Sequence, residues 1–331
     1  DAQLLQLATG AFVSQAIYIA AKLAIADLLA DGPKSTEYLS VATGTHERSL
    51  YRVLRSISSI GVFTELADGT FANSPMSESL KADHPRSTRD LTIWINEEEH
   101  WRVYGHLMYS VKTGKPAFDK VYGEPIFPYL FHTNKELGQI FNQAMTSLSH
   151  QATGPVLEAY DFSGAEVIAD IAGGFGHLLA AVLEANPSAK GILFDLPEVL
   201  AGAPEMLNKY GVSDRVTLVE GNFFEAVPAK ADVYLLKHII HDWDDERDVK
   251  ILSNIGVSMD ANSKLLIIDA VLSGPNTPDL GKIIDLEMLL LPGGVERTAN
   301  EFEALLRSAG FKMTRIIPTK GPMSIIEAVK A

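Results

Sequence analysis

Short apolar runs alternate with longer helical patterns from residue 166 onward. Runs of four to eight apolar residues bounded by turn residues indicate buried strands, and helices between such runs favour parallel pairing. The predicted strands lie near 167–171, 191–195, 215–219, 232–236, 264–271, 311–317 and 323–329. The pattern therefore predicts an α/β domain with a seven-stranded, doubly wound, Rossmann-like sheet.

The first 30 residues form a helical pattern that is rich in Ala, Leu and Ile on nearly all sides. A helix this apolar at a chain end is expected to be buried against a second subunit. Its run from Ala11 to Ala30 carries Gln15, Lys22 and Asp27, which argue against a membrane span. We therefore expect a homodimer and no membrane partner.

Residues 35–73 have the order helix, turn, helix and hairpin. Ser35 is a plausible cap for the first helix, 48–57 form the second, and Asp68-Gly69 marks the hairpin turn. This is the layout of a winged helix, a fold that often binds DNA. Residues 34–90 hold seven basic and seven acidic side chains, whereas a DNA-reading wing needs a basic face. We expect a dimer-forming role and no nucleic-acid partner.

Residues 91–160 are expected to be helical and are unusually aromatic. Their composition suits either packing between domains or a lid over a flat apolar substrate, and these two readings stay open. We predict three segments: a winged-helix-like dimerisation domain over 1–90, a helical linker and substrate lid over 91–160, and a catalytic domain over 161–331.

Composition narrows the chemistry of the 331-residue chain. A net charge of −14 disfavours nucleic acid and anionic membranes. The chain has no cysteine, which excludes disulfides, thiolate metal sites and cysteine nucleophiles. With no visible signal peptide, we expect a cytoplasmic location.

A glycine-rich turn follows the first predicted strand of the sheet, with Gly173, Gly174 and Gly176 before an apolar helix. Such a turn lets the backbone and the helix N-terminus approach a ligand closely. The nicotinamide fingerprint needs a third glycine where Leu179 stands, so dinucleotide binding is disfavoured. Asp195 closes the next strand, where an acid accepts hydrogen bonds from a ribose diol. A cofactor that carries a ribose but no pyrophosphate is expected, which indicates S-adenosylmethionine.

A histidine follows the fourth strand, at the edge where the glycine turn is also expected. His241 has an ordinary pKa of about 6.5, which suits a general base near neutral pH. Asp269, at the end of the next strand, and Glu296, in a loop before a helix, could each fix its tautomer. His238 lies one strand residue earlier, and we assign it no role.

Five motifs together resemble the S-adenosylmethionine-dependent small-molecule O-methyltransferases of the plant caffeate type and their bacterial natural-product relatives. They are Asp170-Ile-Ala-Gly-Gly-Phe-Gly176, Phe194-Asp-Leu-Pro197, Gly221-Asn-Phe-Phe224, Lys237-x-x-x-His-Asp-Trp243 and Glu296-Arg-Thr298. The likeness covers nearly the whole chain and implies a class I methyltransferase domain behind the dimerisation domain.

The resemblance assigns site residues to three groups. His241 would be the base, with Asp269 and Glu296 beside it. S-adenosylmethionine would bind Gly173, Gly174, Gly176, Asp195, Leu196, Asn222, Phe223, Phe224, Lys237 and Trp243, with Asp195 on the ribose, Lys237 on the methionine part and Trp243 near the adenine. The acceptor would contact Trp101, Phe141, Met145 and Met288.

Three positions depart from the family pattern. Ala172 replaces the first glycine of the loop, and Asn222 replaces the acid that meets the adenine. An amide still accepts a hydrogen bond from the adenine amine, but without charge. Leu148 stands where plant members carry another pocket histidine, so we expect a different acceptor.

The expected reaction is methyl transfer to a hydroxyl of an aromatic or polyketide-like small molecule, with no metal. The acidic run Asp242, Asp244, Asp245 and Glu246 invites a magnesium site, but an acid-rich helix N-terminus is the preferred reading. Two alternatives remain. One is a relative that uses the cofactor for N- or C-methylation or hydroxylation, and the other is a non-enzymatic winged-helix regulator.

Overall fold

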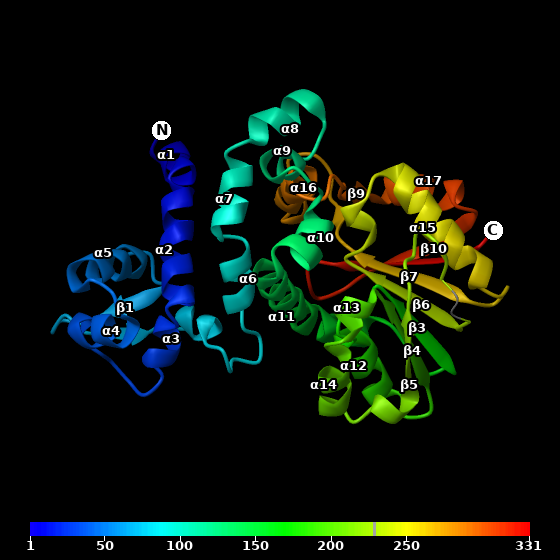
Figure 1. Ribbon diagram of the computed structural model, residues 1–331, viewed down its shortest axis with the longest axis horizontal. Helices are drawn as coiled ribbons and strands as arrows, with labels where there is room; N and C mark the ends of the chain where they lie inside the picture. The colour runs from blue at the N-terminus through cyan, green and yellow to red at the C-terminus, as the bar shows by residue number, and fades with distance from the viewer. Residues whose placement is uncertain (228–229) are drawn as a thin grey trace. The chain divides into compact units, whose positions relative to one another are not determined.

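The computed structural model describes residues 1–227 and 230–331, which form two compact units. Unit 1 consists of Asp1–Trp101 and Glu136–Leu148, and unit 2 of Arg102–Lys135 and Ser149–Ala331. One long helix, α11 (Lys135–Ala159), contributes residues to both units (Figure 1). The three-segment division expected from the sequence stays a prediction.

Unit 1 has the predicted order of helix, turn, helix and hairpin. Ser35 caps the first of these helices, because its hydroxyl accepts a hydrogen bond from the Tyr38 amide at 3.2 Å. The two hairpin strands pair antiparallel around Gly69, whose φ of +81° suits glycine. The elements of unit 1 are α1 (Ala2–Ala8), α2 (Gly10–Lys22), α3 (Ile25–Leu28), α4 (Thr36–Thr43), α5 (Glu47–Ser58), β1 (Phe63–Glu65), β2 (Phe71–Asn73), the 3₁₀ turn η1 (Ser77–Leu80), α6 (Arg89–Trp94), the start of α7 (Glu98–Tyr104) and the middle of α11.

The N-terminal helices expose large apolar side chains. Helix α1 has no buried residue, Leu7 is 72% exposed, and Phe12 of α2 is 75% exposed. Exposed apolar surface of this kind is typical of an interface with another protein. Within the described residues, no single helix has the length and apolarity to cross a membrane. Among the helices of the described residues, α1 and α2 taken together, bent by 44°, meet that test by length and composition.

Unit 2 is built on a seven-stranded sheet in the order β10-β11-β7-β6-β3-β4-β5. Strand β11 runs antiparallel to both of its neighbours, and the other neighbouring strands are parallel. The strands are β3 (Val167–Ile171), β4 (Lys190–Asp195), β5 (Val216–Glu220), β6 (Val233–Lys237), β7 (Lys264–Asp269), β10 (Phe311–Pro318) and β11 (Ser324–Lys330). All seven predicted strands are confirmed. The fifth ends at Asp269, and Val271–Leu272 (β8) instead pairs with Arg297–Thr298 (β9).

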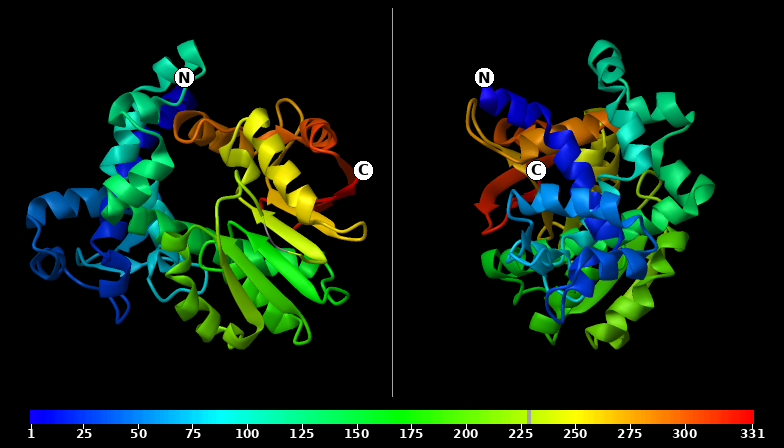
Figure 2. Two further views of the ribbon diagram at one scale, coloured as in Figure 1. Left: turned by 45° about the vertical axis from the view of Figure 1, so that its right-hand side comes forward. Right: turned by 90° about the vertical axis from the view of Figure 1, so that its left-hand side faces the viewer.

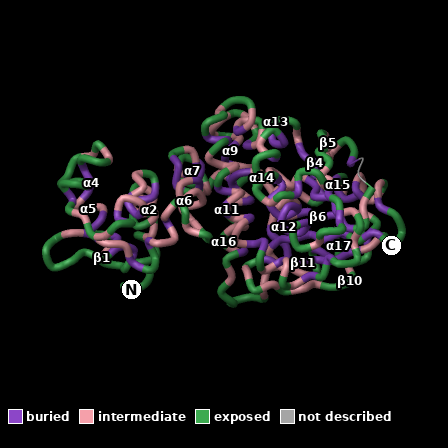
Figure 3. Tube along the Cα trace, turned by 90° about the horizontal axis from the view of Figure 1, so that it is seen from below, coloured by how far each residue is buried: buried purple, intermediate pink, exposed green. Residues whose placement is uncertain are grey.

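Helices cover both faces of this sheet (Figures 1 and 2). Along β7, Leu265 and Ile267 face one apolar cluster with α15 (Asp245–Ser258) and α17 (Ala299–Ser308), whereas Leu266 and Ile268 face another with α12 (His177–Ala185) and α14 (Ala203–Lys209). Successive side chains of a strand point to opposite faces, so a doubly covered strand must be apolar throughout. This explains why the buried residues gather at the sheet (Figure 3).

The remaining elements of unit 2 are short. They are the rest of α7, α8 (Leu107–Thr113), α9 (Ala117–Tyr122), α10 (Ile126–Pro128), the π turn η2 (Tyr129–Thr133), α13 (Pro197–Leu200), η3 (Ser213–Arg215), η4 (Ile240–Asp242) and α16 (Gly281–Leu290).

A buried carboxylate ties the outer strands of the sheet together. Glu327 of β11 accepts hydrogen bonds from Tyr160 at 2.8 Å, Thr314 at 2.7 Å and the Arg315 guanidinium at 3.1 Å. Burial alone would raise the pKa of this carboxyl, but these donors outweigh burial and lower the pKa to about 2.

Candidate active site

The glycine turn lies between β3 and α12, at the carboxyl edge of the sheet. Gly174 and Gly176 have φ of +63° and +79°, and Ala172 has φ of +55°, a left-handed conformation that favours glycine. A Cβ on Gly173 would lie 2.6 Å from the Asp170 carboxylate. The turn is therefore tight, and the alanine at 172 keeps the glycine conformation despite its side chain.

Asp195 ends β4 beside this turn. Its Oδ2 accepts the Gly174 amide at 2.8 Å, and its Oδ1 accepts the Leu196 amide at 2.7 Å. Burial raises the pKa of this carboxyl to about 6, although the two amides oppose the rise. Each oxygen keeps a lone pair, so the carboxylate can still accept from a diol.

Lys237 ends β6, two strands from Asp195. Its Nζ donates to Ser149 Oγ at 2.7 Å. Burial lowers the pKa of the amine, against the pull of Asp170 and Asp269. The cation thus lies at the carboxyl edge of the sheet, with the buried Asp170 carboxylate contributing to its electrostatic environment.

Aromatic side chains cluster beyond the ends of β5 and β6. The rings of Phe223 and Phe224 are 4.8 Å apart, and Trp243 meets Phe224 edge-on at 4.8 Å. Trp243 Nε1 is buried and has no hydrogen-bond partner among the described residues. Asn222 Oδ1 accepts the Phe224 amide at 3.0 Å, which leaves its NH₂ group as a donor. The cluster offers flat apolar surface with two polar groups, a composition that suits a purine ring.

His241 lies in η4, directly after β6, between several carboxylates. Its Nδ1 lies 2.7 Å from Glu296 Oε1 and 4.0 Å from Asp269 Oδ1, while Nε2 lies 3.7 Å from Asp242 Oδ1. Glu296 is thus the acid within hydrogen-bond distance, and Asp269 is a charged neighbour. Burial would lower the imidazole pKa, but Asp269, the hydrogen bond to Glu296 and the Asp242 charge outweigh burial and raise the pKa to about 10.

The loop 293–298 holds Glu296 against His241. A Cβ on Gly294 would lie 2.0 Å from the His241 carbonyl oxygen, and the Val295 amide donates to that oxygen at 2.9 Å. The Glu296 amide donates to Asp285 Oδ1 at 2.8 Å. The backbone thereby fixes where the Glu296 carboxylate lies.

Arg297 holds the backbone on either side of His241 in place, a role that the sequence analysis did not predict. Its guanidinium donates to the carbonyl oxygens of Ile240 at 3.0 Å and Trp243 at 3.2 Å, on either side of His241. It also pairs with Asp248 Oδ2 at 2.8 Å, and with Asp245 at the start of α15. Asp244 caps α15, and Asp245 and Glu246 lie in its first turn, which is the helix start preferred from the sequence. Asp242 lies before this helix, in η4 beside His241.

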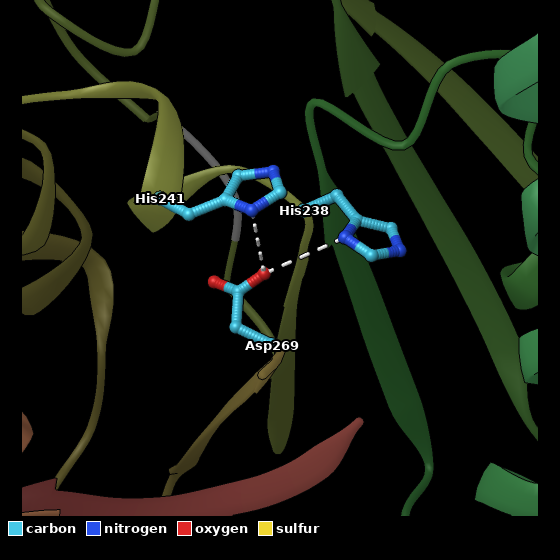
Figure 4. A group of neighbouring side chains, drawn as sticks. All are labelled: His238, His241 and Asp269. Carbon is cyan, nitrogen blue, oxygen red and sulfur yellow. Dashed lines mark ion pairs between the residues drawn. The ribbon is translucent and has the colours of Figure 1, made fainter. Parts of the chain in front are cut away.

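His238 lies closer to the site than its position in the strand suggested. Its backbone has φ of +56°, which turns the chain just after β6. Its Nδ1 lies 3.7 Å from Asp269 Oδ1, and its ring stacks on that of His241 at 5.1 Å (Figure 4). Asp269 is therefore flanked by two imidazoles. A left-handed residue after a strand has no signal in the sequence pattern, which is why this neighbour was missed.

A second histidine pair lies at the start of α12, next to the glycine turn. His177 Nε2 lies 2.7 Å from His150 Nδ1 and 2.9 Å from the Tyr210 hydroxyl, and Thr153 Oγ1 lies 3.0 Å from His177 Nδ1. Burial lowers the His177 pKa to about 3, so the buried ring is neutral. The sequence analysis did not single out this pair, because its members come from distant segments.

The four expected acceptor residues fall in different units. Trp101, Phe141 and Met145 belong to unit 1, where Phe141 meets Trp94 edge-on at 5.1 Å, and Met288 is buried on α16 of unit 2. Their role in acceptor binding stays a prediction.

The fold and this edge of the sheet define an S-adenosylmethionine-dependent methyltransferase. Residues 104–312 match the family model of an O-methyltransferase domain, and residues 5–83 match an O-methyltransferase dimerisation domain. The chain belongs to this O-methyltransferase family.

Relatives cover nearly the full length. A phenazine O-methyltransferase, PhzM of Lysobacter antibioticus, is 45% identical over 98% of this chain and 95% of the relative. An 8-amino-8-demethylriboflavin N,N-dimethyltransferase of Streptomyces davaonensis is 37% identical over 95% of this chain and 91% of the relative. The solved structure of NcsB1, an O-methyltransferase from neocarzinostatin biosynthesis in complex with S-adenosylmethionine and 2-hydroxy-5-methyl naphthoic acid, is 30% identical, covers 96% of both chains and has a TM-score of 0.82.

These findings confirm several expectations from the sequence. The chain is a methyltransferase of the natural-product type, it uses S-adenosylmethionine, and it carries an N-terminal dimerisation domain. The non-enzymatic regulator is set aside. The roles of single residues stay predictions.

Proposed function

We propose that the chain transfers a methyl group from S-adenosylmethionine to a hydroxyl of an aromatic or polyketide-like small molecule, as a homodimer and without a metal. The exposed apolar side chains of α1 and α2 support the dimer, as does the match to a dimerisation domain. The cofactor supplies an electrophilic methyl carbon, activated by the sulfonium charge.

The residues at the sheet edge fit this cofactor. Asp195 accepts from the ribose, and Lys237 takes the carboxylate of the methionine part. The aromatic cluster of Phe223, Phe224 and Trp243 holds the adenine, where the unpartnered Trp243 Nε1 gains an acceptor. At Gly174, where a Cβ would meet nothing within 4 Å, the turn leaves the backbone open to close approach. Departures at Ala172 and Asn222 are tolerated, because Ala172 keeps the left-handed conformation and Asn222 Oδ1, which accepts the Phe224 amide, has a second lone pair for the adenine amine.

The observation that carries the proposal is the 2.7 Å contact between His241 Nδ1 and Glu296 Oε1. In the neutral ring, a carboxylate at Nδ1 holds the proton on that nitrogen, so Nε2 carries the lone pair that accepts the acceptor's proton. The surrounding carboxylates raise the imidazole pKa to about 10, close to the ordinary value of about 10 for a phenol. A base and an acid of matched pKa exchange a proton with little driving force either way.

This arrangement favours oxygen over nitrogen as the methylated atom. A neutral aromatic amine attacks through its own lone pair and sheds its proton after the bond has formed. A hydroxyl oxygen is a poor nucleophile until its proton is removed, so a strong buried base serves O-methylation. The N,N-dimethyltransferase relative makes N-methylation the second candidate.

The test compares a phenol with its aniline analogue in the same aromatic scaffold, with the methylated product located by mass spectrometry. His241→Ala should lower kcat for the phenol by about 10²–10⁴-fold. It should leave the dissociation constant of S-adenosylhomocysteine within about twofold, because His241 is not assigned to the cofactor. His84→Ala, which removes an imidazole from unit 1, is the matched control. Full phenol turnover by the His241 variant, or exclusive aniline methylation by the wild type, would overturn the proposal.

A further inference from the structure

Three potential metal ligands meet beside the proposed base. His238 Nδ1, His241 Nδ1 and Asp269 Oδ1 all lie within 4.8 Å of one another. Both imidazoles direct Nδ1 toward the same carboxylate oxygen, at 3.7 Å from His238 and 4.0 Å from His241 (Figure 4). The two imidazole nitrogens and the shared carboxylate oxygen thus converge on one point, although neither nitrogen is within hydrogen-bond distance of that oxygen.

The carboxylate at the centre of this group has no hydrogen-bond donor among the described residues. Asp269 is 0% exposed, and neither of its oxygens has a hydrogen-bond partner in the described part of the chain. A buried carboxylate without hydrogen bonds costs several kcal/mol unless a cation or donor compensates it. Glu296 Oε2 is likewise buried and unpartnered, so the pocket holds unused oxygen donors next to two nitrogens.

Two imidazoles and a carboxylate are ligands that Zn²⁺ and similar divalent transition metals prefer, whereas Mg²⁺ takes oxygen ligands. Tetrahedral Zn²⁺, with bonds of about 2.0–2.2 Å, places neighbouring ligand atoms about 3.4 Å apart. The separations of 3.7 and 4.0 Å from Asp269 Oδ1 would shrink by about 0.3 and 0.6 Å. The two Nδ1 atoms, which lie within 4.8 Å of each other, would also approach. His238, 21% exposed at its side chain, leaves the group reachable from solvent.

We propose that His238, His241 and Asp269 form a site for Zn²⁺ or a similar divalent transition metal. The ion is an inhibitor of the proposed reaction and not its cofactor, and this second part rests on the proposed function.

Inhibition follows from which nitrogen the ion takes. A metal at His241 Nδ1 displaces the proton that Glu296 holds there, and the remaining ring proton then resides on Nε2. An imidazole with its proton on Nε2 cannot accept another from the acceptor. The metal therefore removes the base while leaving Asp195 and Lys237, the proposed cofactor contacts, untouched.

Binding is tested without turnover, on the full-length chain freed of metal by EDTA. Titration with CoCl₂ should produce a ligand-field absorption in the visible range that saturates at one ion per chain, and ZnCl₂ should abolish it. His238→Ala removes one ligand and should weaken Co²⁺ binding at least about tenfold. His84→Ala should bind as the wild type does. Absence of the Co²⁺ spectrum, or equal Co²⁺ binding by the wild type and His238→Ala, would overturn the site.

Activity gives the second readout. ZnCl₂ should inhibit methyl transfer by the wild type, EDTA should restore it, and His238→Ala should need at least about tenfold more Zn²⁺ for the same fractional inhibition. Inhibition of both proteins at the same Zn²⁺ concentration would overturn the inhibitory role. Should no acceptor be methylated while Co²⁺ binds as expected, the proposed function fails and the metal site stands.

Discussion

Replacing Glu296 by Gln tests the proposed base through its partner. The substitution keeps the size of the side chain and one acceptor oxygen, but it replaces the other oxygen by an NH₂ donor and removes the charge. In the wild type the pKa of His241 rises from 6.5 to about 10. That rise corresponds to roughly 5 kcal/mol of preference for the protonated ring, since each pKa unit is about 1.36 kcal/mol.

Three carboxylates share this effect: Asp269, Glu296 and Asp242. Loss of the Glu296 charge removes on the order of 1–2 kcal/mol of this preference, which lowers kcat about tenfold at pH values above the pKa of the ring, where the neutral base is available and the charged ring forms during proton transfer. If the amide presents its NH₂ group to Nδ1, the ring adopts the wrong tautomer and the loss approaches about 10⁴-fold. We therefore expect kcat for a phenol acceptor to fall at least about tenfold when it is measured above pH 10.

The assay follows the methylated phenol by mass spectrometry under saturating cofactor, in buffer containing EDTA. Glu303→Gln on the exposed face of α17 is the matched control and should behave as the wild type does. The pH profile gives a second readout. A base with a raised pKa is free only as the pH rises toward that pKa, so activity should increase toward about pH 10 in the wild type.

Loss of the Glu296 charge lowers the His241 pKa, so the activity of the Glu296→Gln variant should begin to rise at a lower pH than that of the wild type. A variant with unchanged kcat and an unchanged pH profile would refute the role of Glu296. Weaker binding of S-adenosylhomocysteine with unchanged kcat would place this residue with the cofactor instead.

Three further predictions concern stability and assembly. Ala172→Gly should raise the free energy of unfolding in urea by about 1 kcal/mol, because residue 172 has a left-handed backbone. The control Ala304→Gly, in the middle of α17, should lower the free energy of unfolding by about 1 kcal/mol. Equal effects of the two substitutions would contradict the left-handed conformation at residue 172. Phe12→Glu should shift the sedimenting species from dimer to monomer, and Val257→Glu, equally exposed on α15, should not. Glu327→Gln should cost about 1 kcal/mol of stability at pH 7, a figure reduced for solvent screening. Because the Glu327 pKa is lowered from 4.5 to about 2, its contribution is present above pH 4.5 and is lost as the pH falls toward 2, so the difference between the two proteins should shrink in acid.

Much of the catalytic unit could be predicted, because strands covered on both faces must be apolar throughout. An apolar run such as Leu265 to Ile268 indicates a buried strand, whichever strands pair with it. The carboxyl ends of those strands then meet at one edge, so Asp195, Lys237 and Asp269 could be placed together from their positions alone. Glu296 could be proposed as a partner of His241 but not ranked above Asp269, since the loop that delivers it is irregular.

Other parts had no signal of this kind. The positive φ of His238 depends on how the chain leaves β6. The pattern of polar and apolar residues around position 238 does not predict that turn. The contact of His150 with His177 joins residues 27 positions apart on two helices. Aromatic residues between 91 and 160 occur in cores and in pockets alike, so Phe141 could not be assigned to either by composition.

Helix α11 has a consequence for how such enzymes can diversify. Its residues 136–148 belong to unit 1, where Phe141 packs on Trp94 and Ser147 donates to the Ser87 carbonyl, and its residues from 149 belong to unit 2. Neither core is encoded by one uninterrupted stretch of the gene. A single crossover between two relatives near residue 101 would thus pair one parent's Trp94 with the other parent's Phe141. Exchange of an intact N-terminal unit requires three crossovers, near residues 101, 135 and 148, which favours inheritance of the two units together.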